Sequence, residues 1–152
     1  MTRKRTAREV ALHLLRVRPR TRKELRQRLQ GKGFPEEEIE EVIQELQNTG
    51  LLDEQEFAEA FVLGKVRKLY SRSWIFKALM KAGVTEAMAT RVLEELYSDE
   101  DVYRGLLQHA QEVASHVRDP EKAKRRIYNF ILRRGHSASL AYQILREIYG
   151  KV

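Results

Sequence analysis

Residues 25–46 read LRQRLQGKGFPEEEIEEVIQEL, with an apolar stripe on either side of a glycine. Leu25 and Leu29 share one face of a helix, because residues four apart are neighbours on a helix surface. Gly33 can end that helix in the left-handed conformation, which other residues rarely adopt. The second stripe has the i, i+3, i+4, i+7 spacing of a helix face: Ile39, Val42, Ile43 and Leu46. The stretch therefore predicts a helix, a glycine turn and a second helix.

This pattern of seven positions occurs three times in the 152-residue chain, at intervals of about 50 residues. The second copy is Ile75, Leu79, Gly83, Ala89, Val92, Leu93 and Leu96, and the third is Ile127, Ile131, Gly135, Ala141, Ile144, Leu145 and Ile148. A further amphipathic helix is predicted ahead of each pair, over residues 7–16, 54–68 and about 102–115. We therefore expect three tandem three-helix repeats, at residues 1–52, 53–98 and 99–152.

Side chains that can accept hydrogen bonds from a first helical turn precede most of these helices. They are Thr6, Thr21 with Glu24, Asp53 with Glu56, Ser73, Thr85, Asp119 ahead of Pro120, and Ser137. No segment shows the alternation of a strand, and a repeat of this size buries too little core to be stable alone. The predicted fold is all-α, with three tandem three-helix repeats stacked into an elongated, curved solenoid-like body.

The composition excludes several classes of protein. The chain has no cysteine, which rules out disulfides and thiol nucleophiles and is typical of a reducing compartment. No apolar signal segment follows the basic residues Arg3–Arg5, and no apolar run is long enough to span a bilayer. We therefore expect a cytoplasmic monomer with no membrane partner.

The net charge of +7 is distributed in alternating blocks. Residues 1–34 carry +10, residues 35–59 carry −10, residues 60–85 carry +6, residues 86–101 carry −5 and residues 102–152 carry +6. The first two helices of each repeat are therefore basic, and stacking the repeats in register would align them into one positive surface. Such a surface suits a polyanion or an acidic protein groove, whereas the alternative interpretation is an ordinary solvated helix face.

No arrangement of residues predicts catalysis or a metal site. His109 and His116 lie about 10 Å apart along one helix, too far for one metal ion to bridge directly. Gly31-Lys32-Gly33 lacks the preceding strand and the following Ser or Thr of a phosphate-binding loop. We expect a protein that is not an enzyme and binds no cofactor and no metal.

Aromatic residues are interleaved with cations at Tyr70–Lys77 and Arg126–Phe130, a composition that proteins use to stack on unpaired bases. Four aromatic residues, one of them in the second segment, fit the apolar core stripes of their helices better: Phe57, Phe61, Phe130 and Tyr142. Trp74 precedes the buried position Ile75, which favours a place in the seam between repeats over base stacking.

The chain resembles the RecX family, regulators of the RecA recombinase, over nearly its whole length. The resemblance is strongest at Leu25-Arg26-Gln27-Arg28-Leu29, Lys32-Gly33-Phe34, Ile39, Val42-Ile43, Leu46, Gly50-Leu51-Leu52-Asp53, Phe57-Ala58 and Phe61-Val62. Weaker matches are Ile75, Leu79 and Lys81-Ala82-Gly83-Val84, then Arg125-Arg126-Ile127, Phe130 and Leu132-Arg133-Arg134-Gly135. Two departures are Tyr70-Ser71-Arg72-Ser73-Trp74-Ile75, where the family has a glycine and basic residues, and His136, where an apolar residue is usual.

The resemblance implies a regulator of recombination, DNA repair and the SOS response that lies along the RecA nucleoprotein filament. Its partners would be RecA and the single-stranded DNA within the filament, with free DNA as a further candidate, and it would inhibit ATP hydrolysis and strand exchange. The cations assigned to this basic face are Arg22, Arg26, Arg28, Lys32, Arg72, Lys77, Lys81, Lys122, Arg125, Arg126, Arg133 and Arg134.

Two other functions remain open at this point. Three-helix units with basic helices also resemble helix-turn-helix proteins, so the chain could bind DNA by itself. Few Asn or Gln side chains stand at candidate recognition positions, however, and Arg alone mostly contacts phosphates. A helical scaffold for protein partners, with no nucleic acid, is the third hypothesis.

Overall fold

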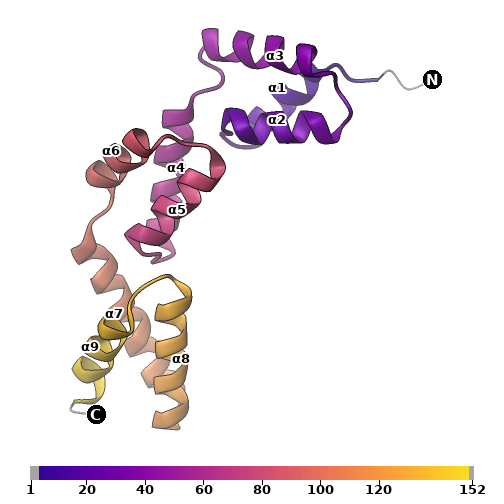
Figure 1. The fold of residues 1–152 in the computed structure, drawn as a ribbon. Helices are drawn as coiled ribbons and strands as arrows, with labels where there is room; N and C mark the ends of the chain where they lie inside the picture. Colours follow the sequence, from indigo (N-terminus) through magenta and orange to yellow (C-terminus); the bar gives the residue numbers. More distant parts are fainter. Residues whose placement is uncertain (1–3, 151–152) are drawn as a thin grey trace. The chain divides into compact units, whose positions relative to one another are not determined.

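The computed structural model describes residues 4–150, and over this range it contains nine helices and no strand (Figure 1). The helices are α1 (Ala7–Val17), α2 (Arg22–Gly31), α3 (Glu36–Asn48), α4 (Glu54–Arg67), α5 (Arg72–Ala82), α6 (Glu86–Leu96), α7 (Asp99–His116), α8 (Pro120–Arg133) and α9 (Ala138–Tyr149). The predicted all-α fold is confirmed.

Most helices begin where the sequence predicts, at side chains that accept from the first turn. Thr21 and Glu24 form a complete capping box at the start of α2, and Asp53 accepts from the backbone N–H groups of Gln55 and Glu56. Thr6, Thr85, Asp119 and Ser137 cap α1, α6, α8 and α9 in the same way.

Two predicted helix starts are wrong. Ser73 is not the cap of α5, because Ser71 accepts from the backbone N–H of Trp74 at 3.1 Å and the helix already begins at Arg72. Helix α7 begins at Asp99, three residues before the predicted start, because Ser98 accepts from the N–H of Asp101 at 3.2 Å. In both cases an earlier serine satisfies the first-turn donors.

The recurring positions behave alike in all three copies. Gly33, Gly83 and Gly135 have φ values of +87°, +102° and +89°, the left-handed region that favours glycine. Each glycine ends the turn between a pair of helices. Of the recurring apolar side chains, all are buried except Leu96 and Ile148, which are half-buried.

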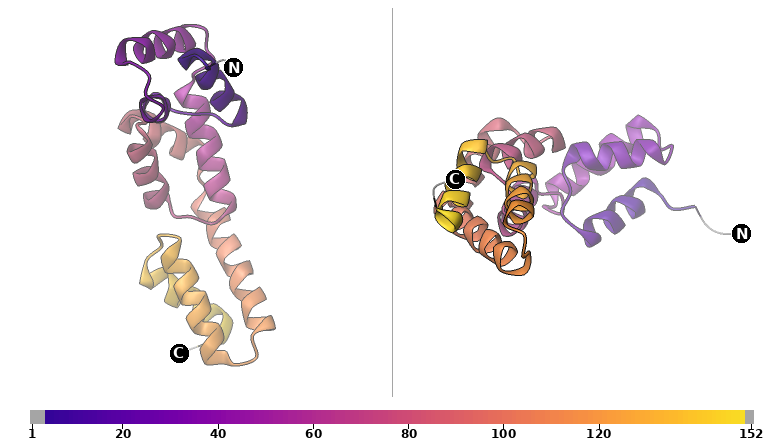
Figure 2. Two further views of the ribbon diagram at one scale, coloured as in Figure 1. Left: turned by 90° about the vertical axis from the view of Figure 1, so that its right-hand side faces the viewer. Right: turned by 90° about the horizontal axis from the view of Figure 1, so that it is seen from below.

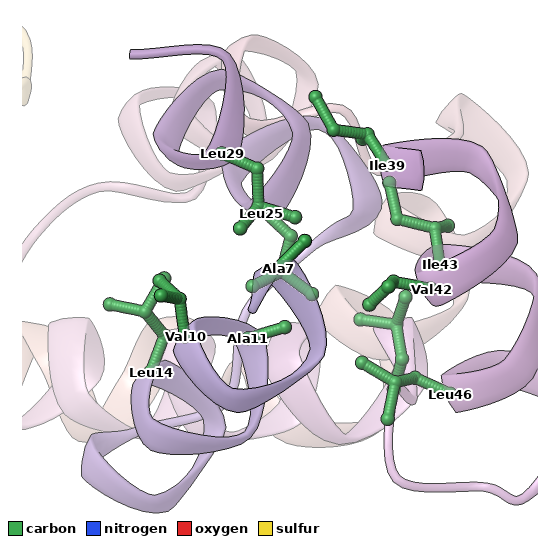
Figure 3. Close-up of a cluster of buried hydrophobic side chains, with 11 residues drawn as sticks. Ala7, Val10, Ala11, Leu14, Leu25, Leu29, Ile39, Val42, Ile43 and Leu46 are labelled. Carbon is green, nitrogen blue, oxygen red and sulfur yellow. The ribbon is translucent and has the colours of Figure 1, made fainter. Parts of the chain in front are cut away.

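The described chain forms two compact units, which divide the second predicted repeat between them. Unit 1 runs to Phe61 and includes Ala78–Glu95, whereas unit 2 consists of Val62–Lys77 and the chain from Leu96 onward. In unit 1, α1, α2 and α3 enclose a core whose side chains point toward one another (Figure 3). Its members are Ala7, Val10, Ala11, Leu14, Leu25, Leu29, Ile39, Val42, Ile43, Leu46 and Leu52.

In unit 2, α7, α8 and α9 pack against one another in pairs, as Figure 2 shows in orange and yellow. Helix α7 contributes Val102, Leu106 and Ala110, helix α8 contributes Ala123, Ile127 and Ile131, and helix α9 contributes Ala141, Ile144 and Leu145. All nine side chains are buried. Helices α8 and α9 form a helical hairpin whose turn contains Gly135. Side chains that flank the buried face of each helix therefore lie along the seam between the two helices.

Within unit 1, the start of α2 packs on the glycine turn that follows α5. The Thr21 hydroxyl is fully buried and donates to the carbonyl of Ala82 at 2.6 Å. Lys23 donates to the carbonyl of Lys81 at 3.0 Å, and a Cβ atom on Gly83 would lie 2.9 Å from the Cβ of Lys23. We call this contact joint 1.

Unit 2 contains the equivalent contact between the start of α5 and the glycine turn that follows α8, which we call joint 2. The backbone N–H of Ser71 donates to the carbonyl of Arg134 at 2.8 Å. A Cβ atom on Gly135 would lie 2.6 Å from the hydroxyl oxygen of Ser71 and 2.8 Å from the Cβ of Trp74. Trp74 therefore lies in the seam between the second and third repeats, as its position in the sequence predicts.

The two departures from the family pattern meet at joint 2. His136 contacts the carbonyl of Leu69 through Nε2 at 2.7 Å, and because a carbonyl only accepts, Nε2 carries the proton. Leu69 has a φ of +69°, the one positive value among the non-glycine residues of the described chain. The histidine thus stabilises a backbone conformation that leucine adopts only under strain.

We expect Thr21→Val to lower the free energy of unfolding by about 2–4 kcal/mol, since it removes a helix cap and leaves the half-buried carbonyl of Ala82 without its donor. Ser137→Ala is the matched control, because the exposed Ser137 caps α9 but its hydroxyl makes no contact with another repeat. The control variant should lose only about 1 kcal/mol. Urea unfolding followed by circular dichroism measures both losses, and equal losses would show that joint 1 adds nothing to the cap.

Candidate nucleic-acid interface

All of the net positive charge belongs to unit 2. The segments of unit 2 contain 15 Lys and Arg against 7 Asp and Glu, a net charge of +8. The segments of unit 1 contain 14 against 15, a net charge of −1. The basic N-terminal block is therefore balanced within its own unit by the acidic block that follows it.

Two of the predicted cations of unit 1 are held in ion pairs. Arg22 lies 3.0 Å from the carboxylate of Glu54. Arg26 lies 2.6 Å from the carboxylate of Glu36 and also pairs with Glu40. The hydrogen bond to Glu40 is the largest of the effects that raise the pKa of Arg26. Both guanidinium groups are partly exposed, but their charges are compensated by neighbouring carboxylates.

Three further predicted cations of unit 1, Arg28, Lys32 and Lys81, are exposed and form no ion pair within residues 4–150. Desolvation lowers the pKa of Arg20, with the charges of Arg18 and Arg28 acting in the same direction and that of Glu24 acting against them. Arg18 is itself paired with Glu24 at 3.1 Å, so the positive charge beside the α1–α2 connection is partly compensated.

In unit 2, two predicted cations, Arg72 and Arg134, pack against aromatic rings of the fold. Arg72 lies 3.4 Å from a carboxylate oxygen of Asp99 and 4.9 Å from the ring centre of Tyr97. Desolvation, followed by the charge of Asp99, raises the pKa of Tyr97 to about 12, so its hydroxyl keeps the proton that it donates to the backbone carbonyl of Tyr70 at 3.1 Å. Lys77, by contrast, is exposed and unpaired in the part of the chain that the structure describes.

Arg134 is an integral part of joint 2. Its guanidinium group lies 4.6 Å from the ring centre of Tyr70 and 4.7 Å from that of Phe130, and it donates to the Tyr70 hydroxyl at 2.8 Å. Trp74 packs against the same tyrosine, with its ring centre 4.1 Å from that of Tyr70. Of the twelve predicted cations, Arg134 is therefore the one most committed to the interior.

The densest group of unpaired cations lies on one helix. Four predicted cations of α8 are exposed and have no ion-pair partner among residues 4–150: Lys122, Arg125, Arg126 and Arg133. Lys122, Arg126 and Arg133 follow one another at spacings of four and seven residues, with Asn129 between them, so they lie along one face of α8. We call the four cations Lys122, Arg125, Arg126 and Arg133 the α8 stripe. They point away from the buried face formed by Ala123, Ile127 and Ile131.

One aromatic residue is placed differently from the prediction. Tyr142 is not a core residue, because half of it is exposed (50%), and its ring centre lies 5.3 Å from that of Tyr128. Phe57 is buried, and Phe61 and Phe130 are half-buried. Tyr142 follows the buried Ala141 directly, so it lies on the flank of the apolar stripe of α9 rather than on the stripe itself. That offset was the sequence signal for its exposure.

His109 stacks on Phe130 with ring centres 3.9 Å apart, and desolvation lowers its pKa, with Arg134 acting in the same direction and Glu112 against it. A lowered pKa means that the unfolded chain binds the proton more readily. We therefore expect the contribution of His109 to the free energy of unfolding to be fully present above about pH 6.5. It should be lost as the pH decreases through the lower pKa of the folded state. Urea unfolding between about pH 7.5 and about pH 5 measures this, and His109→Gln should remove part of the slope. An unchanged slope would contradict the assignment.

Within residues 4–150, no cluster of three or more His, Asp and Glu side chains is arranged to hold a metal ion. No helix in this range is long and apolar enough to cross a membrane.

Comparisons with known proteins give a consistent result. Residues 7–46 match the family model described as RecX, first three-helix domain. Regulatory protein RecX of Amycolatopsis mediterranei (strain U-32) is 35% identical over 144 residues, which cover 93% of this chain and 82% of that protein. Regulatory protein RecX of Thermobifida fusca (strain YX) is 32% identical, covering 93% of this chain and 77% of that protein. The crystal structure of RecX from Lactobacillus salivarius superposes with a TM-score of 0.70 at 25% identity, covering 93% and 94% of the two chains. The relatives carry the names of regulators.

Proposed function

We propose, on the premise that this chain belongs to the RecX family of regulatory proteins, that it binds the RecA filament on single-stranded DNA and inhibits its activities. The activities affected would be ATP hydrolysis and strand exchange. Binding would depend on exposed cations that meet DNA phosphates and acidic RecA side chains. The protein would act as a cytoplasmic monomer, without a catalytic group of its own.

The observation that carries the proposal is the α8 stripe. Four cations that lack ion-pair partners within the described range face outward from one helix of the unit that bears a net charge of +8. A polyanion gains from such a surface because each phosphate that is neutralised releases counterions. The paired cations of unit 1 gain less, since a phosphate must compete there with a carboxylate of the same chain.

The exposed cations of the other repeats would extend the contact. Arg28, Lys32, Lys77 and Lys81 are available for it, whereas Arg22, Arg26 and Arg72 would have to exchange an intramolecular partner for an intermolecular one. Surface ion pairs contribute at most about 1 kcal/mol, so such an exchange is affordable in free energy. Arg134 would contribute indirectly, by holding joint 2 together.

The test is a measurement of RecA-catalysed ATP hydrolysis and strand exchange on single-stranded DNA, with and without this protein. We expect both activities to fall as the protein approaches stoichiometric coverage of the filament. Unchanged activities at that coverage would end the proposal.

A second candidate function is sequence-specific DNA binding by α8, and Asn129 is the observation that favours it. Asn129 is exposed on the same face of α8 as Lys122, Arg126 and Arg133, and an asparagine on an exposed basic helix can form paired hydrogen bonds with adenine in a major groove. Band shifts on random and on selected duplexes, without RecA, separate the two functions. A strong preference for one duplex sequence that is lost in Asn129→Ala would favour this second function.

A further inference from the structure

The seam between α8 and α9 carries aromatic and basic side chains that contact one another in pairs. Tyr128 and Tyr142 face each other across it, with ring centres 5.3 Å apart. One layer along the seam, the ammonium group of Lys124 lies 5.1 Å from the ring centre of Tyr149. Tyr142 is exposed, whereas the other aromatic side chains among residues 4–150 are buried or half-buried.

Cations surround the tyrosine pair. Arg125 precedes Tyr128 by three residues on α8, and Arg146 follows Tyr142 by four residues on α9, so each lies beside its tyrosine on the helix surface. Both arginines are exposed and unpaired within the described range. The one carboxylate on this flank of α8, Glu121, pairs with Lys124 at 3.4 Å.

The Tyr128 phenol keeps its proton near neutral pH. Desolvation raises the pKa of Tyr128, and the electrostatic interaction and the hydrogen bond with Tyr142 act in the same direction. A neutral phenol beside two guanidinium groups offers a flat apolar face next to positive charge. Phosphates would therefore meet cations here, and bases would meet rings.

We propose that Tyr128 and Tyr142 form a stacking site for unpaired bases of single-stranded DNA, with Arg125 and Arg146 holding the adjacent phosphates. Nonspecific binders of single strands combine these two elements, because every base has a π-face and every linkage a charge. Duplex DNA does not fit the site, since its bases are already stacked and paired. The inference rests on the proposed function only in that both assign nucleic acid to unit 2.

The test uses the full chain alone, without RecA, and three fluorescently labelled probes: oligo-dT, an abasic oligodeoxynucleotide of the same length, and a duplex. We expect Tyr142→Ala to weaken the binding of oligo-dT at least about fivefold and to leave binding of the abasic strand unchanged. Tyr142→Phe keeps the ring and should bind oligo-dT like the wild type. Arg125→Gln should weaken both single strands, because each has phosphates.

Leu63→Ala is the matched control, since Leu63 is another exposed large apolar side chain of unit 2 (41%) and lies on a different helix. It should leave all three affinities unchanged. Equal weakening of oligo-dT and abasic strands by Tyr142→Ala would overturn the stacking site. Unchanged oligo-dT binding by Tyr142→Ala, accompanied by loss of RecA inhibition, would also overturn it and would make the seam a protein contact. Inhibition of RecA by the wild type is measured separately, so the proposed function stands or falls by itself.

Discussion

Replacing Gly135 with alanine should lower the free energy of unfolding of unit 2 by about 2–4 kcal/mol. Two effects add. A non-glycine residue at a φ of +89° is strained by about 1–2 kcal/mol, and the new Cβ must displace Ser71 or Trp74, which lie 2.6 and 2.8 Å away. Trp74 is the only tryptophan of the chain and lies at joint 2, so its fluorescence reports this unfolding directly.

The repeat supplies its own control for this experiment. Gly33 occupies the same position in the first repeat with a φ of +87°, but nothing lies within 4 Å of where its Cβ would be. Gly33→Ala should therefore lose only the strain, about 1–2 kcal/mol, as measured by urea unfolding and circular dichroism. If Gly33→Ala and Gly135→Ala lose the same free energy, the close approach at joint 2 does not exist.

Neutralising the α8 stripe should abolish most of the inhibition of RecA. In the variant Lys122→Gln/Arg125→Gln/Arg126→Gln/Arg133→Gln, glutamine keeps a high helix propensity while four exposed charges are lost. Each phosphate contact contributes about 0.7 to the salt slope of a single-strand complex, so the slope should decrease by up to about 3. The affinity at physiological salt should fall by at least about tenfold. The concentration that halves ATP hydrolysis by RecA measures the loss.

A charge change of the same sign elsewhere is the control. Arg8 and Arg104 are exposed cations that pair with Glu45 and Glu100, so Arg8→Gln/Arg104→Gln removes charge without removing an uncompensated one. This double variant should inhibit RecA like the wild type. The variant Arg126→Gln/Arg133→Gln removes the same amount of charge from the α8 stripe and should inhibit RecA less than the wild type does. Equal loss in the two double variants would mean that net charge, and not the α8 stripe, determines binding.

The fold could be predicted from the sequence because its signals are local and repeated. The three left-handed glycines and the apolar stripes recur at matching positions, and three agreeing copies leave little room for another secondary structure. The misplaced cap of α5 shows the limit of this approach. Ser71 and Ser73 are equally good caps in sequence, and only the contact between Ser71 and Arg134 across joint 2 distinguishes them.

The candidate site was less predictable, because a list of cations does not show which carboxylate each one meets. Arg26 and Arg126 look alike in sequence, yet Arg26 pairs with Glu36 and Glu40 whereas Arg126 is unpaired within the described residues. Glu36 comes from the acidic block that the sequence places after the basic one, so the compensation depends on α3 folding back on α2. Tyr142 shows the same limitation, since one position of offset from a buried stripe separates a core residue from an exposed one.

The central claim is that uncompensated cations hold this protein on the RecA filament, and cosedimentation with filaments on single-stranded DNA at increasing salt tests it most directly. We expect the bound fraction of the wild type to fall steeply with salt, and the fourfold α8 variant to bind weakly even at low salt and with a shallower dependence. Binding of the wild type that does not change with salt, or an α8 variant that sediments with filaments like the wild type, would contradict the account.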